Sequence, residues 1–207
     1  MLTIINYKAG NVRSIQNMLK KIGVQSIISG NIEDIEKADT LILPGVGHFD
    51  YGMEQLEKSG LIPVLNKKVL EEKTPILGIC LGVQLFTKGS EEGKHKGLGW
   101  IDAETVAFNK KKLPAGYKIP HMAWSEINFN ENCKLFDKIH EYPPRFYFVH
   151  SYHLKANNKK NIIATTKYGY EFTVGLKQEN IIGVQFHPEK SHKFGMQFLK
   201  NFISLVK

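Results

Sequence analysis

The 207-residue sequence contains only two cysteines, Cys80 and Cys133, which excludes a disulfide framework. No apolar run approaches the roughly 18 residues that a membrane span requires. The first residues also lack the basic segment and apolar core of a signal peptide. We therefore expect a cytoplasmic protein without a membrane partner, in a reducing compartment that suits a reactive thiol.

Basic residues outnumber acidic ones, 28 to 20, for a net charge of +8. The lysines are scattered, and no stretch interleaves aromatic with basic residues as a nucleic-acid stacking surface requires. We therefore predict no nucleic-acid partner and leave open a local basic patch that docks an acidic protein. The length and the 42% hydrophobic content are those of a single domain, 1–207.

Strand and helix patterns alternate in the first half of the chain. Strands are predicted at 2–6, 24–29 and 40–43 and in the apolar run before Cys80, and helices at 12–22, 32–37 and 49–70, the last broken near Pro63. Such alternation predicts a parallel sheet covered by helices on both faces. Ligands of such sheets bind beyond the carboxyl ends of the strands.

The second half has a different texture, with short β-like runs separated by turn residues. These runs lie at 99–108, 123–129, 145–149, 162–167, 172–176 and 181–186. A final helix carries Phe194, Phe198 and Phe202 four residues apart, a spacing typical of a core face. The predicted class is α/β, with a mostly parallel central sheet flanked by helices and an additional β-rich part in the second half.

Gly78-Ile79-Cys80-Leu81-Gly82 is the most informative segment. An apolar strand precedes it and a helical pattern follows, as in the cysteine version of a nucleophile elbow, where glycines tolerate a strained turn that exposes the reactive side chain. The thiol would lie at a helix N-terminus, where the helix dipole favours a thiolate.

A base for this nucleophile follows the predicted strand 181–186 in the segment His187-Pro188-Glu189. Cys80, His187 and Glu189 form a candidate triad, in which the imidazole takes the thiol proton and the carboxylate orients the ring. Pro188 cannot donate a ladder hydrogen bond, so strand pairing should stop at the histidine.

Two further segments bear on ligand binding. Leu43-Pro44-Gly45-Val46-Gly47 ends an early strand, and its flexible backbone amides are suited to an oxyanion hole together with the amide of Leu81. The segment lacks a phosphate-loop signature. His150 and His153 have a spacing that could suggest a metal, but on one strand they would point to opposite faces, so we predict no metal site.

These motifs together resemble the class I, triad-type glutamine amidotransferases, and within them the glutaminase subunits of imidazole glycerol phosphate synthases. The resemblance is carried by the segments 10–14, 43–50, 78–86, 120–124, 147–152 and 185–191. It implies a flavodoxin-like fold, no cofactor, and hydrolysis of L-glutamine to glutamate and ammonia through a glutamyl thioester on Cys80.

The resemblance also implies roles for other residues. Those that would bind the substrate, through side chains or backbone, are Gly45, Gly47, Leu81, Gln84, Ser151 and Tyr152. The implied partner is a (β/α)8-barrel cyclase, which receives the ammonia and makes imidazole glycerol phosphate and an aminoimidazole carboxamide ribotide in histidine biosynthesis. Residues at positions that face this partner are Asn11, Arg13, His121, Trp124 and Lys190.

The chain departs from the family pattern at Ala123, where glycine is usual, and at Ser125, where asparagine is usual. Both positions lie in the segment implied to face the synthase. A paralogous glutaminase that serves another synthase, such as a surface-sugar amidotransferase, is therefore a competing hypothesis. A stand-alone cysteine hydrolase and a non-catalytic binding protein with the same fold are two more.

Overall fold

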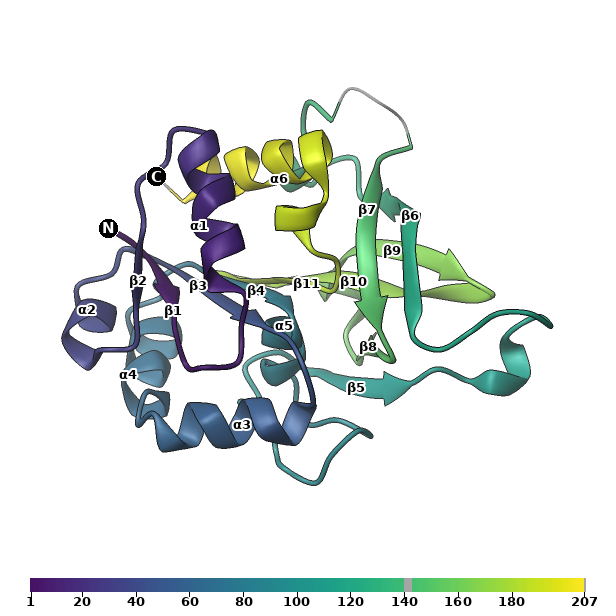
Figure 1. Ribbon diagram of the computed structural model, residues 1–207, viewed down its shortest axis with the longest axis horizontal. Coiled ribbons are helices and arrows are strands. Elements are labelled where there is room, and N and C mark those ends of the chain that lie inside the picture. Colours follow the sequence, from purple (N-terminus) through teal and green to yellow (C-terminus); the bar gives the residue numbers. More distant parts are fainter. Residues whose placement is uncertain (140–142, 207) are drawn as a thin grey trace.

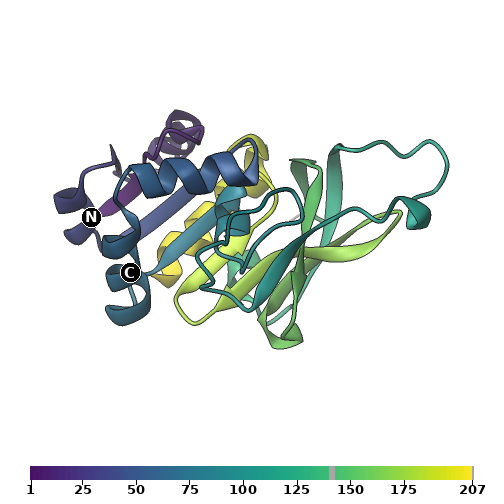
Figure 2. The same cartoon turned by 90° about the horizontal axis from the view of Figure 1, so that it is seen from below.

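The computed structural model describes residues 1–139 and 143–206, and Figures 1 and 2 show it from two directions. The helices are α1 (Val12–Lys21), α2 (Ile32–Glu36), α3 (Phe49–Lys58), α4 (Ile62–Asn66), α5 (Leu81–Leu85) and α6 (His192–Leu205), with a π-helical turn at Lys67–Glu71. The strands are β1 (Leu2–Ile5), β2 (Ile27–Ser29), β3 (Thr40–Gly45), β4 (Ile76–Cys80), β5 (Ala103–Ala107), β6 (His121–Phe129), β7 (Arg145–His150), β8 (Tyr152–Ala156), β9 (Ile162–Tyr168), β10 (Tyr170–Gln178) and β11 (Ile181–Val184). No helix in these ranges is long and apolar enough to cross a membrane.

Five parallel strands form the centre of the sheet, in the order β2-β1-β3-β4-β11. Every residue of β1, β3, β4 and β11 is buried. The reason is visible in Figure 1, where α1 and α6 cover one face and α3 to α5 cover the other. The predicted parallel sheet between two helical layers is confirmed, and it places the carboxyl ends of β3, β4 and β11 side by side.

The β-rich second half continues the same sheet in antiparallel fashion. β10 pairs with β11, and β9, β6 and β7 follow outward, while β8 pairs with β10 and β5. The added β-rich part is thus confirmed, and its outer strands extend away from the helical layers (Figure 2).

The strand β8 was not predicted, and its presence corrects the interpretation of the two histidines. His150 ends β7 and His153 lies on β8, because the ladder breaks at Ser151. The assumption of one continuous strand with the two rings on opposite faces was wrong. Both rings instead pack against Phe108, with ring centroids 5.3 and 5.0 Å from its own.

The phenylalanine stripe of α6 belongs to the core, as predicted. Phe194, Phe198 and Phe202 are buried, and the Phe198 ring contacts those of Phe136, Phe146 and Phe186. This cluster packs α6 against the sheet, close to the residues that follow β11.

Replacing Phe198 by Ala should lower the free energy of unfolding by about 3 to 5 kcal/mol, because a buried ring is lost and a cavity remains. Urea denaturation followed by circular dichroism measures the change. Lys200→Ala on the exposed face of α6 is the matched control and should change stability by less than about 0.5 kcal/mol. Equal effects in the two variants would contradict this account of the core.

Candidate active site

Cys80 occupies the strained turn that the sequence predicts. It ends β4, caps α5 and has φ 54° and ψ −113°, a conformation that L-residues rarely adopt. Glycines make this turn possible, because a Cβ at Gly82 would lie 1.9 Å from the Leu43 carbonyl oxygen and one at Gly78 would lie 2.5 Å from the Phe86 ring. The strand β4 therefore presents the thiol at the carboxyl edge of the sheet.

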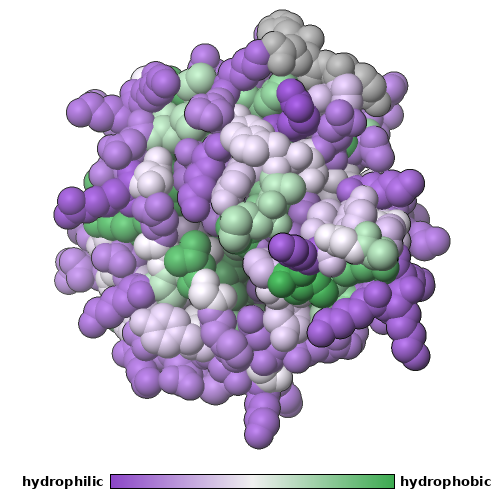
Figure 3. All heavy atoms as spheres, turned by 45° about the vertical axis from the view of Figure 1, so that its right-hand side comes forward, coloured by the Kyte–Doolittle hydropathy of each residue, from purple (hydrophilic) through white to green (hydrophobic). Residues whose placement is uncertain are grey.

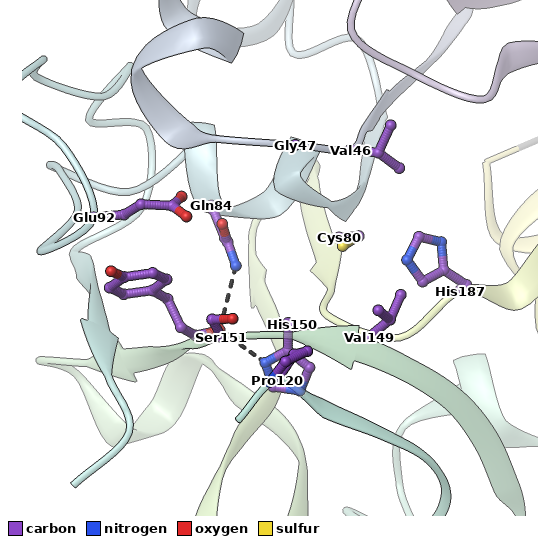
Figure 4. A pocket seen from close by; sticks show the side chains of 11 residues that line it. Val46, Gly47, Cys80, Gln84, Glu92, Pro120, Val149, His150, Ser151 and His187 are labelled. Carbon is purple, nitrogen blue, oxygen red and sulfur yellow. Dashed lines mark hydrogen bonds between the residues drawn. The ribbon is translucent and has the colours of Figure 1, made fainter. Parts of the chain in front are cut away.

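His187 and Glu189 arrive from the neighbouring strand β11, which pairs with β4 in parallel. The Nδ1 atom of His187 lies 2.8 Å from Oε1 of Glu189, and both side chains are almost fully buried. Nδ1–H donates to this carboxylate, which leaves Nε2 for Cys80 (Figure 4). Burial opposes the charged ring, but the electrostatic influence of the neighbouring Cys80 and the hydrogen bond to Glu189 outweigh it and raise the pKa of His187 to about 10.

A cavity of about 290 Å³ lies over this edge of the sheet. It is lined by Val46, Gly47, Cys80, Gln84, Glu92, Pro120, Val149, His150, Ser151, Tyr152 and His187. The fold thus brings the thiol and the imidazole into one cavity, together with four of the six residues implied to bind substrate: Gly47, Gln84, Ser151 and Tyr152.

Gly45 and Leu81 are not among the residues that line the cavity, and the binding of a ligand by Gly45 stays a prediction. A Cβ at Gly45 would be 2.6 Å from the Tyr7 hydroxyl and 2.7 Å from the Leu81 Cβ, which shows that this glycine allows β3 to pack against the elbow. The Leu81 side chain is 1% exposed and belongs to the core. Only its backbone amide remains for the implied oxyanion role.

The backbone after β3 is held by a contact with the first loop of the chain. The Val46 amide donates a hydrogen bond to the Ala9 carbonyl at 2.9 Å, and Gly47 has φ 104°. The Val46 amide is therefore occupied outside the cavity in this conformation. Gly47 supplies the positive φ at the point where the segment turns over Cys80.

Gln185 is a site residue that the sequence interpretation missed. It is completely buried, its Oε1 accepts from Nε2 of Gln84 at 3.0 Å, and its Nε2 donates to Sγ of Cys80 at 3.6 Å. A polar residue near the end of an otherwise apolar run, two residues before His187, was the available signal. Glu92 was missed as well, and it lies in an irregular loop without a motif.

The residues implied to face a partner divide into two groups. Asn11, Arg13, Trp124 and Lys190 are exposed, with the Trp124 ring stacked on His192 and the Lys190 ammonium over the Tyr147 ring. His121 is completely buried. The expectation that His121 touches a partner is therefore wrong, because strand alternation on β6 turns its side chain inward while that of Met122 faces outward.

The chain matches known proteins over nearly its full length. The family model described as "Glutamine amidotransferase class-I" matches residues 3–205. The chain belongs to the class I glutamine amidotransferase family. Among solved structures, this amidotransferase resembles "Structure of PurLQS from Thermotoga maritima", with a TM-score of 0.75 at 17% identity over 100% of this chain and 98% of that one, a likeness that concerns the fold.

Two curated relatives of this amidotransferase are similar over their whole length. A Methanococcus maripaludis protein named "Imidazole glycerol phosphate synthase subunit HisH 2" is 57% identical over 98% of both chains. A Pseudomonas aeruginosa protein of the same name is 46% identical over 100% of both chains.

The raised pKa of His187 predicts a pH dependence. The ring binds its proton more tightly in the folded chain than at its ordinary pKa of 6.5, so its stabilising contribution is complete below pH 6.5 and is lost as the pH rises towards 10. We expect the ring to stay doubly protonated at about pH 8. In Cys80→Ala the pKa should fall, because the thiolate charge is gone. A ¹⁵N NMR titration of labelled histidines measures the pKa of His187 in the wild type and in the variant. A wild-type His187 ring that titrates with its ordinary pKa would contradict the stabilisation of its charge by Cys80 and Glu189.

Proposed function

We propose that this chain is the glutaminase subunit of an imidazole glycerol phosphate synthase. The observation that carries the proposal is the meeting of Cys80 and His187 in one cavity, with Glu189 hydrogen-bonded to the far side of the ring. The names and identities of the two full-length relatives support it. The enzyme hydrolyses L-glutamine to L-glutamate and ammonia and passes the ammonia to its synthase partner.

The proposed reaction has two halves. The Cys80 thiolate attacks the side-chain amide carbon of glutamine, and the imidazolium of His187 protonates the departing nitrogen, so that ammonia leaves and a glutamyl thioester remains. Water, deprotonated by His187, then attacks the thioester carbon, the carbon–sulfur bond breaks, and glutamate is released while the Cys80 thiolate and the His187 imidazolium are regenerated. Glu189 keeps the tautomer and orientation of the ring through both halves.

The cavity lining supplies groups that suit glutamine. Glu92 brings a carboxylate, whose charge complements the α-ammonium group, and its Oε2 is fixed by the amide of Phe49 at 2.8 Å. Ser151 and Tyr152 offer backbone groups at the break between β7 and β8. Gln84 is held with its Nε2 toward Gln185, which leaves its carbonyl oxygen for the ligand.

The oxyanion hole is proposed to be incomplete without the partner. The Leu81 amide follows the nucleophile, but the amide of Val46 is bonded to the Ala9 carbonyl. Turning of the segment at Gly47 would free that amide for the tetrahedral intermediate. Docking next to this exposed segment would thus control the rate of hydrolysis.

We propose a (β/α)8-barrel cyclase as the partner and the face formed by Asn11, Arg13, Trp124 and Lys190 as its docking face. The helix α1 packs against the turn at Pro188–Lys190, which supports one continuous face near the triad. The face of the molecule drawn in Figure 3 is mostly hydrophilic, with small apolar patches among the hydrophilic side chains. We further propose that residues 1–207 act as one domain in the reducing cytoplasm, where Cys80 stays reduced and forms no disulfide.

A second candidate acceptor is a different synthase. Both full-length relatives carry the number 2 in their names, and this chain has Ala123 and Ser125 on β6, beside the proposed docking face. Co-purification of the tagged chain with either a histidine-pathway cyclase or another synthase decides between the two acceptors.

The isolated chain should hydrolyse glutamine slowly, and addition of the cyclase with its nucleotide bound should raise the rate by orders of magnitude, because docking completes the oxyanion hole. A coupled glutamate assay measures the rate with and without the partner. The variant Lys155→Ala, at an exposed position of β8, is a control that should be activated like the wild type. A chain that is fully active alone would argue against gating.

Cys80→Ala should abolish glutamine-dependent synthesis by the complex, by at least roughly 10³-fold, and leave synthesis from added ammonium salt intact. The comparison of the two nitrogen sources separates loss of the nucleophile from loss of folding or docking. Survival of glutamine-dependent synthesis would remove Cys80 from the mechanism. A second experiment labels Cys80 covalently with an electrophile that mimics glutamine. If peptides block this labelling and glutamine does not, the result favours a peptidase instead.

A further inference from the structure

Two buried histidines connect the strand β6 with the glutamine cavity. His121 begins β6 and His150 ends β7, and the two residues are paired across the ladder. Nδ1 of His121 lies 3.0 Å from Nε2 of His150. Neither residue belongs to the triad, and the mechanism above does not use them.

Each histidine has a second partner. Nε2 of His121 lies 2.8 Å from the hydroxyl of Ser125, and Nδ1 of His150 lies 2.8 Å from the backbone carbonyl of Tyr152. Ser125 is half-buried between the exposed residues Trp124 and Glu126, so one end of the series reaches the proposed docking face. The other end lies in the wall of the cavity (Figure 4).

The single carbonyl at the cavity end fixes the direction of every bond. A carbonyl only accepts, so Nδ1 of His150 carries a hydrogen, and a neutral ring then accepts at Nε2. Nδ1 of His121 must donate to that nitrogen, and Nε2 of His121 in turn accepts from the Ser125 hydroxyl. All donors therefore point from Ser125 toward the cavity.

The surroundings keep both rings neutral. His121 stacks between Tyr168 and Phe148, with centroids 4.2 and 5.0 Å apart, and His150 packs against Phe108. Among the described residues no carboxylate hydrogen-bonds either ring. Burial lowers the pKa of His121 to about 4 and that of His150 to about 3, so neither ring is charged at neutral pH.

The Tyr152 carbonyl connects His150 with Gln84 in the cavity wall, because it accepts hydrogen bonds from both side chains. It also accepts from Nε2 of Gln84 at 3.4 Å, and the same amide donates to Gln185 at 3.0 Å. With Nε2 used in this way, the orientation of Gln84 depends on where the Tyr152 carbonyl points. His150, the last residue of β7, holds that carbonyl at the first residue of β8.

We propose that Ser125, His121 and His150 form a directional chain of hydrogen bonds that positions the Tyr152 carbonyl, and through it Gln84, for glutamine binding. The three are positioning residues, since none touches the reacting atoms. The identity of the substrate in this proposal rests on the proposed function. The geometry of the hydrogen-bond chain does not depend on it. We expect the hydrogen-bond chain to affect the affinity for glutamine, because it ends at groups that are proposed to bind this ligand.

The kinetic test uses the complex with its synthase partner. Ser125→Ala removes the first donor, and His121→Phe keeps the stacked ring but removes both nitrogens. Each variant should raise KM for glutamine about three- to tenfold, which is the effect of losing one buried hydrogen bond. The kcat of each should stay within about twofold of wild type. Ser125→Asn restores a donor and should return KM to within about twofold of wild type. His153→Phe is the matched control, since His153 packs on the same Phe108 ring, bonds to Tyr170 and Leu154, and lies outside the chain.

A spectroscopic test needs no activity. In ¹⁵N-histidine NMR spectra of the wild-type chain, both His121 and His150 should show the neutral tautomer with the hydrogen on Nδ1. A hydrogen on Nε2 of either ring, or a doubly protonated ring at neutral pH, would overturn the proposed direction even if a variant fails to fold.

The outcomes separate the two proposals. A wild-type complex that neither binds nor hydrolyses glutamine would defeat the proposed function. Normal wild-type kinetics with an unchanged KM in both Ser125→Ala and His121→Phe would overturn the chain of hydrogen bonds alone. An equal rise of KM in His153→Phe would also overturn it, because the effect would then come from general disturbance of the aromatic cluster.

Discussion

The turn at Cys80 is the constraint on which the rest of the site depends. A residue with φ 54° between a strand and a helix stores strain, of the order of 1–3 kcal/mol, that only dense surroundings hold in place. The surroundings are dense because glycine stands wherever a side chain would collide: Gly82 against the Leu43 carbonyl and Gly183 against Val83, where a Cβ would come within 1.9 and 2.1 Å. Close packing in the parallel centre of the sheet therefore holds Cys80 in its strained conformation.

Electrostatics builds the second part of the site on that frame. β11 lies next to β4, so the residues that follow β11 are placed beside the thiol without any long loop. Burial of His187 would by itself favour a neutral ring, yet the neighbouring Cys80 and the Glu189 carboxylate reverse this and raise the pKa of the ring. A buried Gln185 amide adds a donor to the sulfur and fixes Gln84 at the same time.

The antiparallel extension gives the parallel centre its substrate wall. β7 and β8 meet at Ser151, where the ladder is broken and backbone groups are left for a ligand. The same extension carries Trp124 on its outer side and His121 on its inner side, one strand exposing the first and burying the second. The proposed docking face and the proposed substrate wall are thus two sides of the same few strands, which is a short physical path for coupling between them.

The sequence by itself determined the features that depend on neighbours along the chain. Alternating apolar segments predicted the helical layers and the parallel strands, and the glycines around Cys80 predicted the strained turn. Strand pairing was expected to stop at His187, before Pro188, but β11 already ends at Val184. Only the tertiary structure decided that His121 is buried, that Gly45 packs against the elbow, that β8 exists, and that Gln185 joins Gln84 to Cys80. These depend on pairing and packing between residues far apart in the chain, and local sequence carries no record of which face a distant strand will cover.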